Sequence, residues 1–234
     1  MYHALNVDLK RRFANNFQFL ASYTWSHSID DSSDLQTLLK PQENRNVRGD
    51  RADSLFDQRH RFVFSGLLAS PPDWRAADGG LKIFFADFLI APILELSSGR
   101  PFNILSGADT NFDLQSTNDR PSVASDGTLC LAGTAPCLAA LPQTGTLGRN
   151  RGITRSYASL DMRVARAVRL GERFRLDVIA EGFNLFNRFN QAAASPFFQD
   201  VNAFGQRGPG GRYYSRPTAS FDARQFQFGL KLNF

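Results

Sequence analysis

Residues 225–234 read QFQFGLKLNF, and every second position in this stretch carries a large apolar side chain. The intervening positions hold glutamine, glycine, lysine or asparagine. Because successive side chains of a β-strand point to opposite faces, this period of two is typical of a strand with one apolar and one polar face. The pattern predicts a strand over residues 223–234.

The same alternation recurs along the rest of the chain. Near the N-terminus, for example, Leu5, Val7 and Leu9 alternate with polar residues. No segment carries a convincing apolar stripe with the 3.6-residue period of an amphipathic helix. We therefore predict six further strands, over residues 3–11, 17–26, 58–69, 82–98, 156–169 and 173–183. The predicted fold is all-β, an antiparallel up-and-down meander of about seven strands.

The composition excludes several classes of protein. Of the 234 residues, 42% are hydrophobic and 21% are charged, which indicates a folded chain rather than a disordered one. The longest apolar run, residues 88–94, is much shorter than the roughly 20 residues of a membrane-spanning helix. Two cysteines are too few for a disulfide-dense scaffold or a four-cysteine zinc site. The formal net charge of +5 comes from arginines that are spread along the chain, so nucleic-acid binding has little support.

The connections between the predicted strands alternate in length. Residues 12–16, 70–81 and 170–172 are short connections, whereas residues 27–57, 99–155 and 184–222 are long ones. A bacterial outer-membrane barrel has this arrangement, with short periplasmic turns and long extracellular loops. The pattern therefore favours a partial transmembrane β-barrel. The alternative is a soluble sheet, because alternation alone does not distinguish an apolar face in lipid from one in a core.

Charged side chains follow the polar face of two neighbouring strands. Around the predicted turn at 170–172, Asp161 and Arg163 are expected to face Arg175, Asp177 and Glu181 across the ladder. In a barrel this set would form a lumenal charge ladder. In a soluble sheet the same residues would lie on a solvated outer face.

Several segments resemble the C-terminal barrel of TonB-dependent outer-membrane receptors of the Oar-like type. They are FQFLASYTWSHSIDD (17–31), DQRHRFVFSG (57–66), LSSGRPFNI (96–104) and LGERFRLDVIAEGFNLFNRFN (170–190). Full chains of that type carry an N-terminal carboxypeptidase-regulatory-like domain. The last strand resembles the outer-membrane assembly signal, which ends in phenylalanine. Its positions here are Phe226, Phe228, Leu230, Leu232 and Phe234.

The resemblance implies a fold, a location and a set of partners. The expected whole protein is a barrel of about 22 strands filled by a plug domain, in the outer membrane of a Gram-negative bacterium. It would take up a scarce solute, small or oligomeric, with energy from the TonB complex. We expect residues 1–234 to be the C-terminal part of such a receptor, a fragment without the plug and N-terminal domains. Further expected partners are outer-membrane lipid, lipopolysaccharide and the barrel-assembly machinery.

Two other functions remain open at this level. One is a passive outer-membrane channel or an adhesin barrel. The other is a soluble, secreted β-sandwich that binds carbohydrate. None of the three is an enzyme, and we predict no cofactor and no metal.

The loops contain a few candidate sites. Six residues separate Cys130 from Cys137 in the longest loop, and a disulfide is favoured over two free thiols in an oxidising compartment. Residues 30–34 and 109–113 are rich in oxygen ligands of the kind that bind Ca²⁺, but neither has the EF-hand spacing, so solvated loops are favoured. Residues 208–212 are glycine-rich without the ending of a phosphate-binding loop.

The three histidines, His3, His27 and His60, have no metal-ligand partner at a helical spacing. A serine-histidine-aspartate set can be assembled on paper from Ser26, His27 and Asp30. Such triads are recognised by geometry, which sequence alone does not provide. We therefore predict that the chain is not catalytic.

Overall fold

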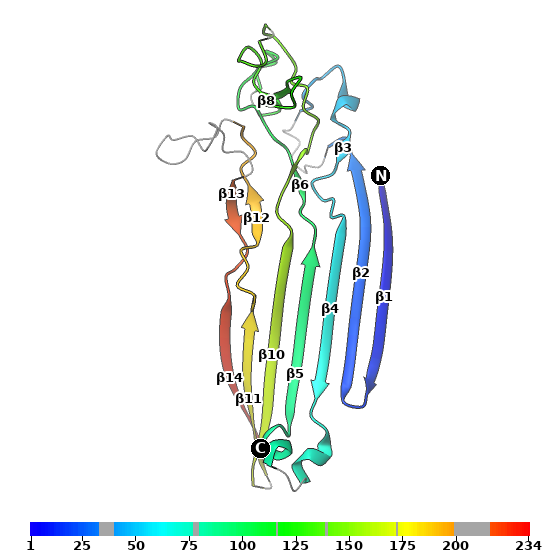
Figure 1. The fold of residues 1–234 in the computed structure, drawn as a ribbon, viewed down its shortest axis with the longest axis vertical. Coiled ribbons are helices and arrows are strands. Elements are labelled where there is room, and N and C mark those ends of the chain that lie inside the picture. The colour runs from blue at the N-terminus through cyan, green and yellow to red at the C-terminus, as the bar shows by residue number, and fades with distance from the viewer. Residues whose placement is uncertain (33–39, 77–79, 116, 139, 172, 199–215) are drawn as a thin grey trace, which may run out of the picture.

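The computed structural model describes residues 1–32, 40–76, 80–115, 117–138, 140–171, 173–198 and 216–234. Seven long antiparallel strands form one sheet, and each pairs with the next long strand along the chain (Figure 1). They are β1 (Tyr2–Ala14), β2 (Phe17–Asp30), β4 (His60–Ala69), β5 (Phe88–Ser97), β10 (Tyr157–Leu170), β11 (Phe174–Phe183) and β14 (Gln225–Asn233). The short strand β3 (Ala52–Asp53) pairs with β2 and completes the sheet of eight. The predicted all-β antiparallel meander is confirmed.

Each long strand overlaps one of the seven predicted segments. The strands β1 and β2 extend beyond their predicted ends at residues 11 and 26, and the predicted strand over 82–98 begins too early. The structure has a short helix, α1 (Gly80–Phe84), and β5 starts only at Phe88. Asp87 adopts a positive φ of 62°, which interrupts an extended chain. The Ser70 backbone N–H then donates to the Phe88 carbonyl at 2.8 Å and fixes the start of β5. The predicted short connection at 70–81 therefore extends to residue 87 and also holds the 3₁₀ helix η2 (Pro72–Ala76).

Tight turns close the sheet at the end where the C-terminus lies (Figure 1). Ala14 pairs with Phe17, so Asn15 and Asn16 form a two-residue hairpin loop. Their φ angles of 52° and 62° are those that a type I′ turn requires, and asparagine tolerates them. Leu170 pairs with Phe174 in the same way across a three-residue loop.

The register gives the sheet two chemically different faces. Partners across a ladder share a face, so the pairing of Val178 with Leu230 and of Ala180 with Phe228 continues one apolar surface from β11 to β14. We call this surface the apolar face. It comprises Leu5, Val7, Leu9, Tyr23, Trp25, Phe62, Phe64, Leu94, Leu96, Leu160, Val164, Leu176, Val178, Phe228 and Leu230.

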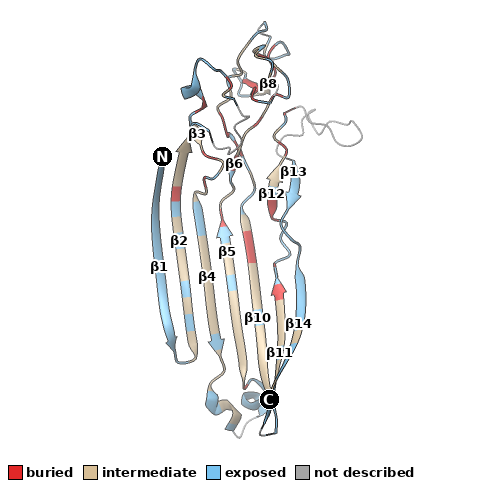
Figure 2. Cartoon of the chain, turned by 180° about the vertical axis from the view of Figure 1, so that it is seen from behind, coloured by how far each residue is buried: buried red, intermediate tan, exposed pale blue. Residues whose placement is uncertain are grey.

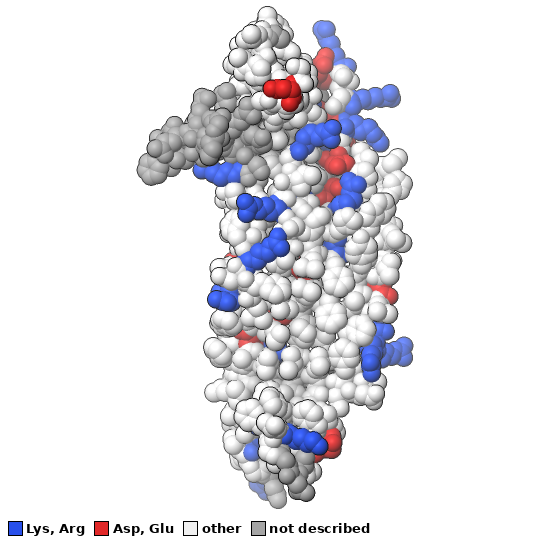
Figure 3. All heavy atoms as spheres, in the orientation of Figure 1, with Lys and Arg blue, Asp and Glu red and all other residues white. Residues whose placement is uncertain are grey.

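The apolar face has no second layer over it among the described residues. Phe228 is 82% exposed and Leu230 is 73% exposed. Figure 3 shows one side of the molecule on which charged side chains are sparse over the long strands and more numerous near the upper end. The apolar side chains therefore do not form the core of a two-layer protein in this structure.

The opposite surface is the polar face. It comprises Asp8, Lys10, Ser22, Thr24, Arg61, Glu95, Asp161, Arg163, Asp177, Glu181, Gln227 and Lys231. Ser22 and Glu95 share this face because both are partners of Val63 on β4.

A compact roof covers the end of the sheet opposite the tight turns. We use this name for residues 40–57, 99–115, 117–138 and 140–155. The roof contains η1 (Val47–Asp50) and two small ladders, β6 (Pro101–Phe102) with β9 (Gly152–Ile153) and β7 (Ser122–Val123) with β8 (Leu129–Cys130). Beside it, β12 (Gln191–Ala194) pairs with β13 (Pro217–Ser220) above β11 and β14.

The buried side chains gather at this upper end. Figure 2 shows red segments in the roof and near the upper ends of the long strands. Ile104, Leu131 and Phe198 form the buried apolar cluster of the described chain. No described helix has the length and apolar character needed to cross a membrane.

Candidate functional site

The polar face of β10, β11 and β14 carries a chain of charged contacts. Arg163 lies directly opposite Glu181, with its guanidinium nitrogen 3.4 Å from a carboxylate oxygen. The Gln227 amide donates a hydrogen bond to the other oxygen of Glu181. Glu181 thus links the two strands that flank β11.

A second set of contacts lies nearer the tight turn. Arg175 Nε donates to Asp177 Oδ1 at 2.7 Å along β11. The Asn233 amide donates to the other oxygen of Asp177 at 3.0 Å, and Lys231 is the register partner of Asp177. Four of the five residues of the predicted ladder thus form two ion pairs, but only Arg163–Glu181 crosses from β10 to β11. Arg175 and Asp177 were expected to face Asp161 and Arg163, whereas the register places them opposite Arg169 and Ala167.

Asp161 lies outside this ladder. The register between β10 and β11 ends at the Met162–Gly182 pair, so Asp161 has no partner on β11, and on the other side of β10 it lies opposite Ile93 of β5. Its carboxylate instead accepts the Asn184 backbone N–H at 2.8 Å and the Ser159 hydroxyl at 2.9 Å. Asn184 directly follows β11, and its φ of 48° turns the chain away from the ladder. Asp161 therefore stabilises the end of a strand.

One polar-face ion pair was not expected from the sequence. Arg61 Nε of β4 donates to Glu95 Oε1 of β5 at 3.0 Å. Their alternation with apolar neighbours placed each on a polar face, but their mutual position depends on the pairing of two strands across the connection at 70–87.

A hollow of about 710 Å³ lies where the polar face meets the roof. Its charged lining residues are Arg61, Arg100, Arg155 and Glu95, three positive and one negative, which leaves a net charge of +2. Tyr157 and Phe221 also line it, with ring centroids 5.2 Å apart in an edge-to-face arrangement. The hollow therefore combines cationic hydrogen-bond donors with an aromatic wall.

Two buried arginines position the roof: Arg120 forms an ion pair within the roof, and Arg149 joins the roof to the sheet. Arg120 contacts Asp50 at 2.7 Å, and both side chains are 7% exposed. Arg149 forms an ion pair with Asp30 at the end of β2 and donates to the Asp50 backbone carbonyl at 2.6 Å. Because these groups are desolvated, the roof has a specific position above the sheet.

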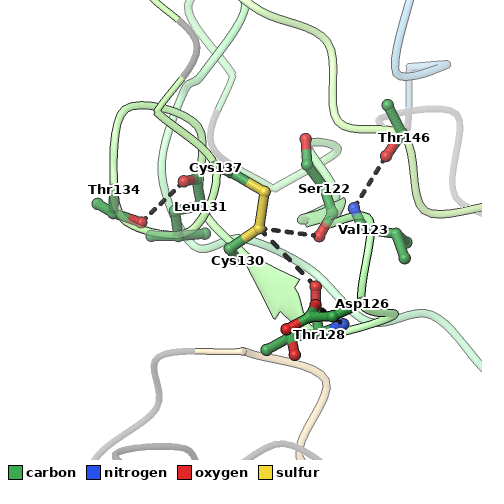
Figure 4. The surroundings of a disulfide bond; sticks show 9 residues. All are labelled: Ser122, Val123, Asp126, Thr128, Cys130, Leu131, Thr134, Cys137 and Thr146. Atoms are coloured by element: carbon green, nitrogen blue, oxygen red, sulfur yellow. Dashed lines mark hydrogen bonds between the residues drawn. A yellow bond between two sulfur atoms is a disulfide. The ribbon is translucent and has the colours of Figure 1, made fainter.

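Cys130 and Cys137 are joined by a disulfide within the roof (Figure 4). Cys130 belongs to β8, and its sulfur lies 3.6 Å from the Ser122 carbonyl oxygen on the paired strand β7. The bond closes a small loop beside this hairpin.

The other candidate residues occupy separate positions. Asp30 pairs with Arg149, and Asp31 contacts Arg51 at 3.4 Å, while residues 33 and 34 lie outside the described residues. Residues 208–212 also lie outside them. His27 Nε2 contacts Asp53 at 2.8 Å, whereas the Ser26 hydroxyl donates to the Gln58 carbonyl. Ser26, His27 and Asp30 therefore do not form a relay.

His60 hydrogen-bonds to the Tyr23 hydroxyl at 2.8 Å. Within the described part of the chain, no group of three or more histidine, cysteine, aspartate or glutamate side chains converges as a metal site.

A family model described as an outer membrane beta barrel domain matches residues 1–227. The chain belongs to this family, and it is a β-barrel protein of the bacterial outer membrane. No curated protein and no solved structure matches the chain. The sheet is barrel wall, and the exposed apolar face has the chemistry that hydrocarbon requires.

Proposed function

We propose that the chain forms the wall and extracellular loops of a TonB-dependent outer-membrane receptor for active uptake of a scarce solute. The segments that resemble Oar-like receptors support this proposal. So do the two edges of the sheet, β1 and β14, because backbone groups in hydrocarbon must be paired. In the intact receptor further strands pair with these edges, a plug fills the lumen, and an N-terminal segment contacts TonB.

In this proposal the polar face lines the lumen and the apolar face contacts lipid. The pairing of Arg163 with Glu181 and of Arg175 with Asp177 favours a water-filled interior, where paired charges remain partly solvated. The plug would contact these groups. Exposed arginines of the roof, such as Arg48 and Arg151, would meet lipopolysaccharide phosphates at the cell surface.

The hollow beneath the roof is the observation that carries the proposal. Its volume of about 710 Å³ lies within the range of ligand sites, and it lies where a solute would enter the lumen. Arg100 and Arg155 suit carboxylate, phosphate or hydroxyl groups, and Tyr157 suits a planar or sugar surface. Uptake requires binding and release without covalent chemistry, so the proposal includes no catalytic step and no cofactor.

The experiment that tests the proposal needs no knowledge of the solute. The full-length protein, purified from outer membranes, is inserted into planar bilayers in KCl solution. A plugged receptor gives no steady conductance until denaturant loosens the plug, and the conductance then appears in steps. A stable conductance in the native protein would identify a passive channel instead.

The terminal strand also has a proposed role, as the signal read by the barrel-assembly machinery. It offers a free edge on the side away from β11, and Phe234 is 96% exposed. Deleting Phe234 from the full-length protein is expected to lower the folded amount in the outer membrane several-fold. Gln227→Ala on the polar face is the control, and equal folded amounts for the two variants would contradict the role.

A further inference from the structure

One segment of the roof holds oxygen atoms that lack hydrogen-bond donors. We call residues 109–115 and 117–119 the aspartate loop. Buried side-chain oxygens of Asn118, Asp119 and the neighbouring Gln42 have no hydrogen-bond partner among the described residues. All three atoms are hydrogen-bond acceptors, so acceptors outnumber the available N–H and O–H donors at this site. Such an imbalance is costly in a buried place unless another group supplies positive charge.

The first half of the loop is wound around its own side chains. Asp109 accepts the backbone N–H groups of Asp113 at 3.2 Å and Leu114 at 2.9 Å. Asn111 Oδ1 also accepts the Asp113 N–H at 3.0 Å. Residues 109, 111 and 113 thus converge from alternate positions, as the first three ligands of an EF-hand loop do. The glutamate that ends such a loop is absent, because Arg120 occupies that position.

The second half supplies buried oxygens that face this turn. Asn118 is 5% exposed, and its amide nitrogen donates to Asp113 Oδ2 at 3.2 Å. The same nitrogen donates to the Pro41 carbonyl at 3.1 Å, and the Asn118 Oδ1 atom has no hydrogen-bond partner among the described residues. Rotation about the side-chain bond exchanges the two amide atoms, so the amide can turn its oxygen toward a cation held by Asp113 in exchange for the bond to Pro41.

Asp119 closes the other side of the loop and is fully buried. One of its oxygens accepts the Thr110 N–H at 2.5 Å and the Thr110 hydroxyl at 3.0 Å, while the other has no donor. The same Asp119 oxygen also accepts the Asn111 N–H at 3.3 Å, so Asp119 is held against the start of the loop.

The charge of the loop is not balanced by the nearest arginine. Arg120 is committed to Asp50 at 2.7 Å. None of the ion pairs among the described residues includes Asp109, Asp113 or Asp119. No ion pair among the described residues therefore neutralises Asp109 or Asp113, and Asp113 contacts the Asn118 amide.

We propose that the aspartate loop binds one Ca²⁺ ion through the side chains of Asp109, Asn111 and Asp113, with Asn118 completing the set. Ca²⁺ accepts carboxylate, amide and backbone oxygens in a flexible geometry, whereas Mg²⁺ demands a near-octahedral set. Because so few carboxylates converge, the affinity belongs to the range of extracellular modules, with Kd of about 10⁻⁴–10⁻³ M. This Ca²⁺ proposal does not depend on whether the barrel is an active receptor or a passive channel.

The test uses the full-length protein purified in detergent and freed of divalent ions. Equilibrium dialysis against ⁴⁵Ca²⁺ is expected to give one saturable site per chain, with competition by Mg²⁺ at least tenfold weaker. Asp113→Asn is expected to weaken binding at least tenfold. Asp126→Asn removes the same charge from the β7–β8 turn of the roof and is expected to leave binding unchanged.

A second measurement keeps the test valid if Asp113→Asn disturbs the roof. Ca²⁺ is expected to protect the wild-type loop between residues 109 and 119 from proteolysis, and Mg²⁺ at the same concentration is not. Absence of saturable Ca²⁺ binding to the wild type up to 10 mM (about tenfold above the weakest expected Kd) would overturn the proposal. So would equal losses of binding in the Asp113 and Asp126 variants, which would indicate a diffuse charge effect.

Discussion

Asp50 is the carboxylate on which the roof depends. It accepts Arg120 at 2.7 Å on one oxygen and the Gln42 backbone N–H at 3.0 Å on the other, and it is 5% exposed. The residue thus connects η1 with the segment that follows the aspartate loop. A buried ion pair adds little net stability relative to an apolar pair, but loss of one partner leaves a desolvated charge.

Arg120→Ala is therefore expected to destabilise the roof by about 3–5 kcal/mol while the sheet stays folded. Hydrogen exchange of the roof amides measures this effect separately from the strands. Arg48→Ala, an exposed arginine of η1, is the matched control and is expected to change exchange little. Similar exchange in the two variants would show that the Arg120–Asp50 pair does not hold the roof.

Asp126 gives the β7–β8 hairpin a pH dependence. Its carboxylate accepts the Thr128 N–H at 2.9 Å, and this bond holds the pKa of Asp126 below its ordinary value of 3.8. Since the pKa is lowered in the folded state, the stabilisation is present above pH 3.8 and is lost as the pH falls through the lowered pKa. In the wild type, hydrogen exchange of the Thr128 backbone amide, corrected for its intrinsic rate, should become faster as the pH falls below 3.8. Asp126→Asn should remove the pH dependence, and an unchanged profile would contradict the assignment.

At the scale of elements, the strands were predictable and the roof was not. A period of two is a local property, so each of the seven long strands could be found from its own residues, as Phe226 and Phe228 illustrate. The roof depends on contacts between residues far apart in the sequence. Arg149 reaches Asp30 over 119 positions, and no local pattern carries that information.

The differences at the candidate site have the same origin. Arg163 and Glu181 could be paired from the sequence because a short turn sets their register. The Arg61–Glu95 pair and the hollow above it could not be predicted from the sequence. Both depend on the register between β4 and β5, which are joined by the long connection at 70–87. Asp161 was misplaced because its partner, Asn184, lies beyond the end of the ladder.

The apolar face of β14 permits a direct test of its lipid contact. Leu230→Arg places a charge on this face near the middle of the strand and is expected to cost about 2–4 kcal/mol if the side chain meets the bilayer interior. Gln227→Arg, on the polar face of the same strand, is expected to cost little. The free energy of unfolding of the full-length protein in lipid vesicles measures the cost of each substitution. Equal costs would mean that the two faces meet similar surroundings.

At the scale of the whole molecule, the described chain is a wall rather than a closed container. One surface is apolar and uncovered, the other is charged, and both edge strands are long. We expect residues 1–234 expressed alone to form no compact, protease-resistant monomer in detergent or lipid. The full-length protein, which is expected to migrate differently before and after heating, is the control. A heat-modifiable monomer of the segment alone would contradict this expectation.

The N-terminus lies at the roof end and the C-terminus at the turn end (Figure 1), so β1 and β14 point in the same direction. Direct closure of one edge onto the other would create a parallel seam in an otherwise antiparallel wall. Two copies joined head to tail would contain two such seams, and two copies joined by identical edges would carry their roofs on opposite sides of the membrane. If residues 1–234 are part of a larger barrel, as we propose, an antiparallel circle with every roof outside requires an odd number of further strands.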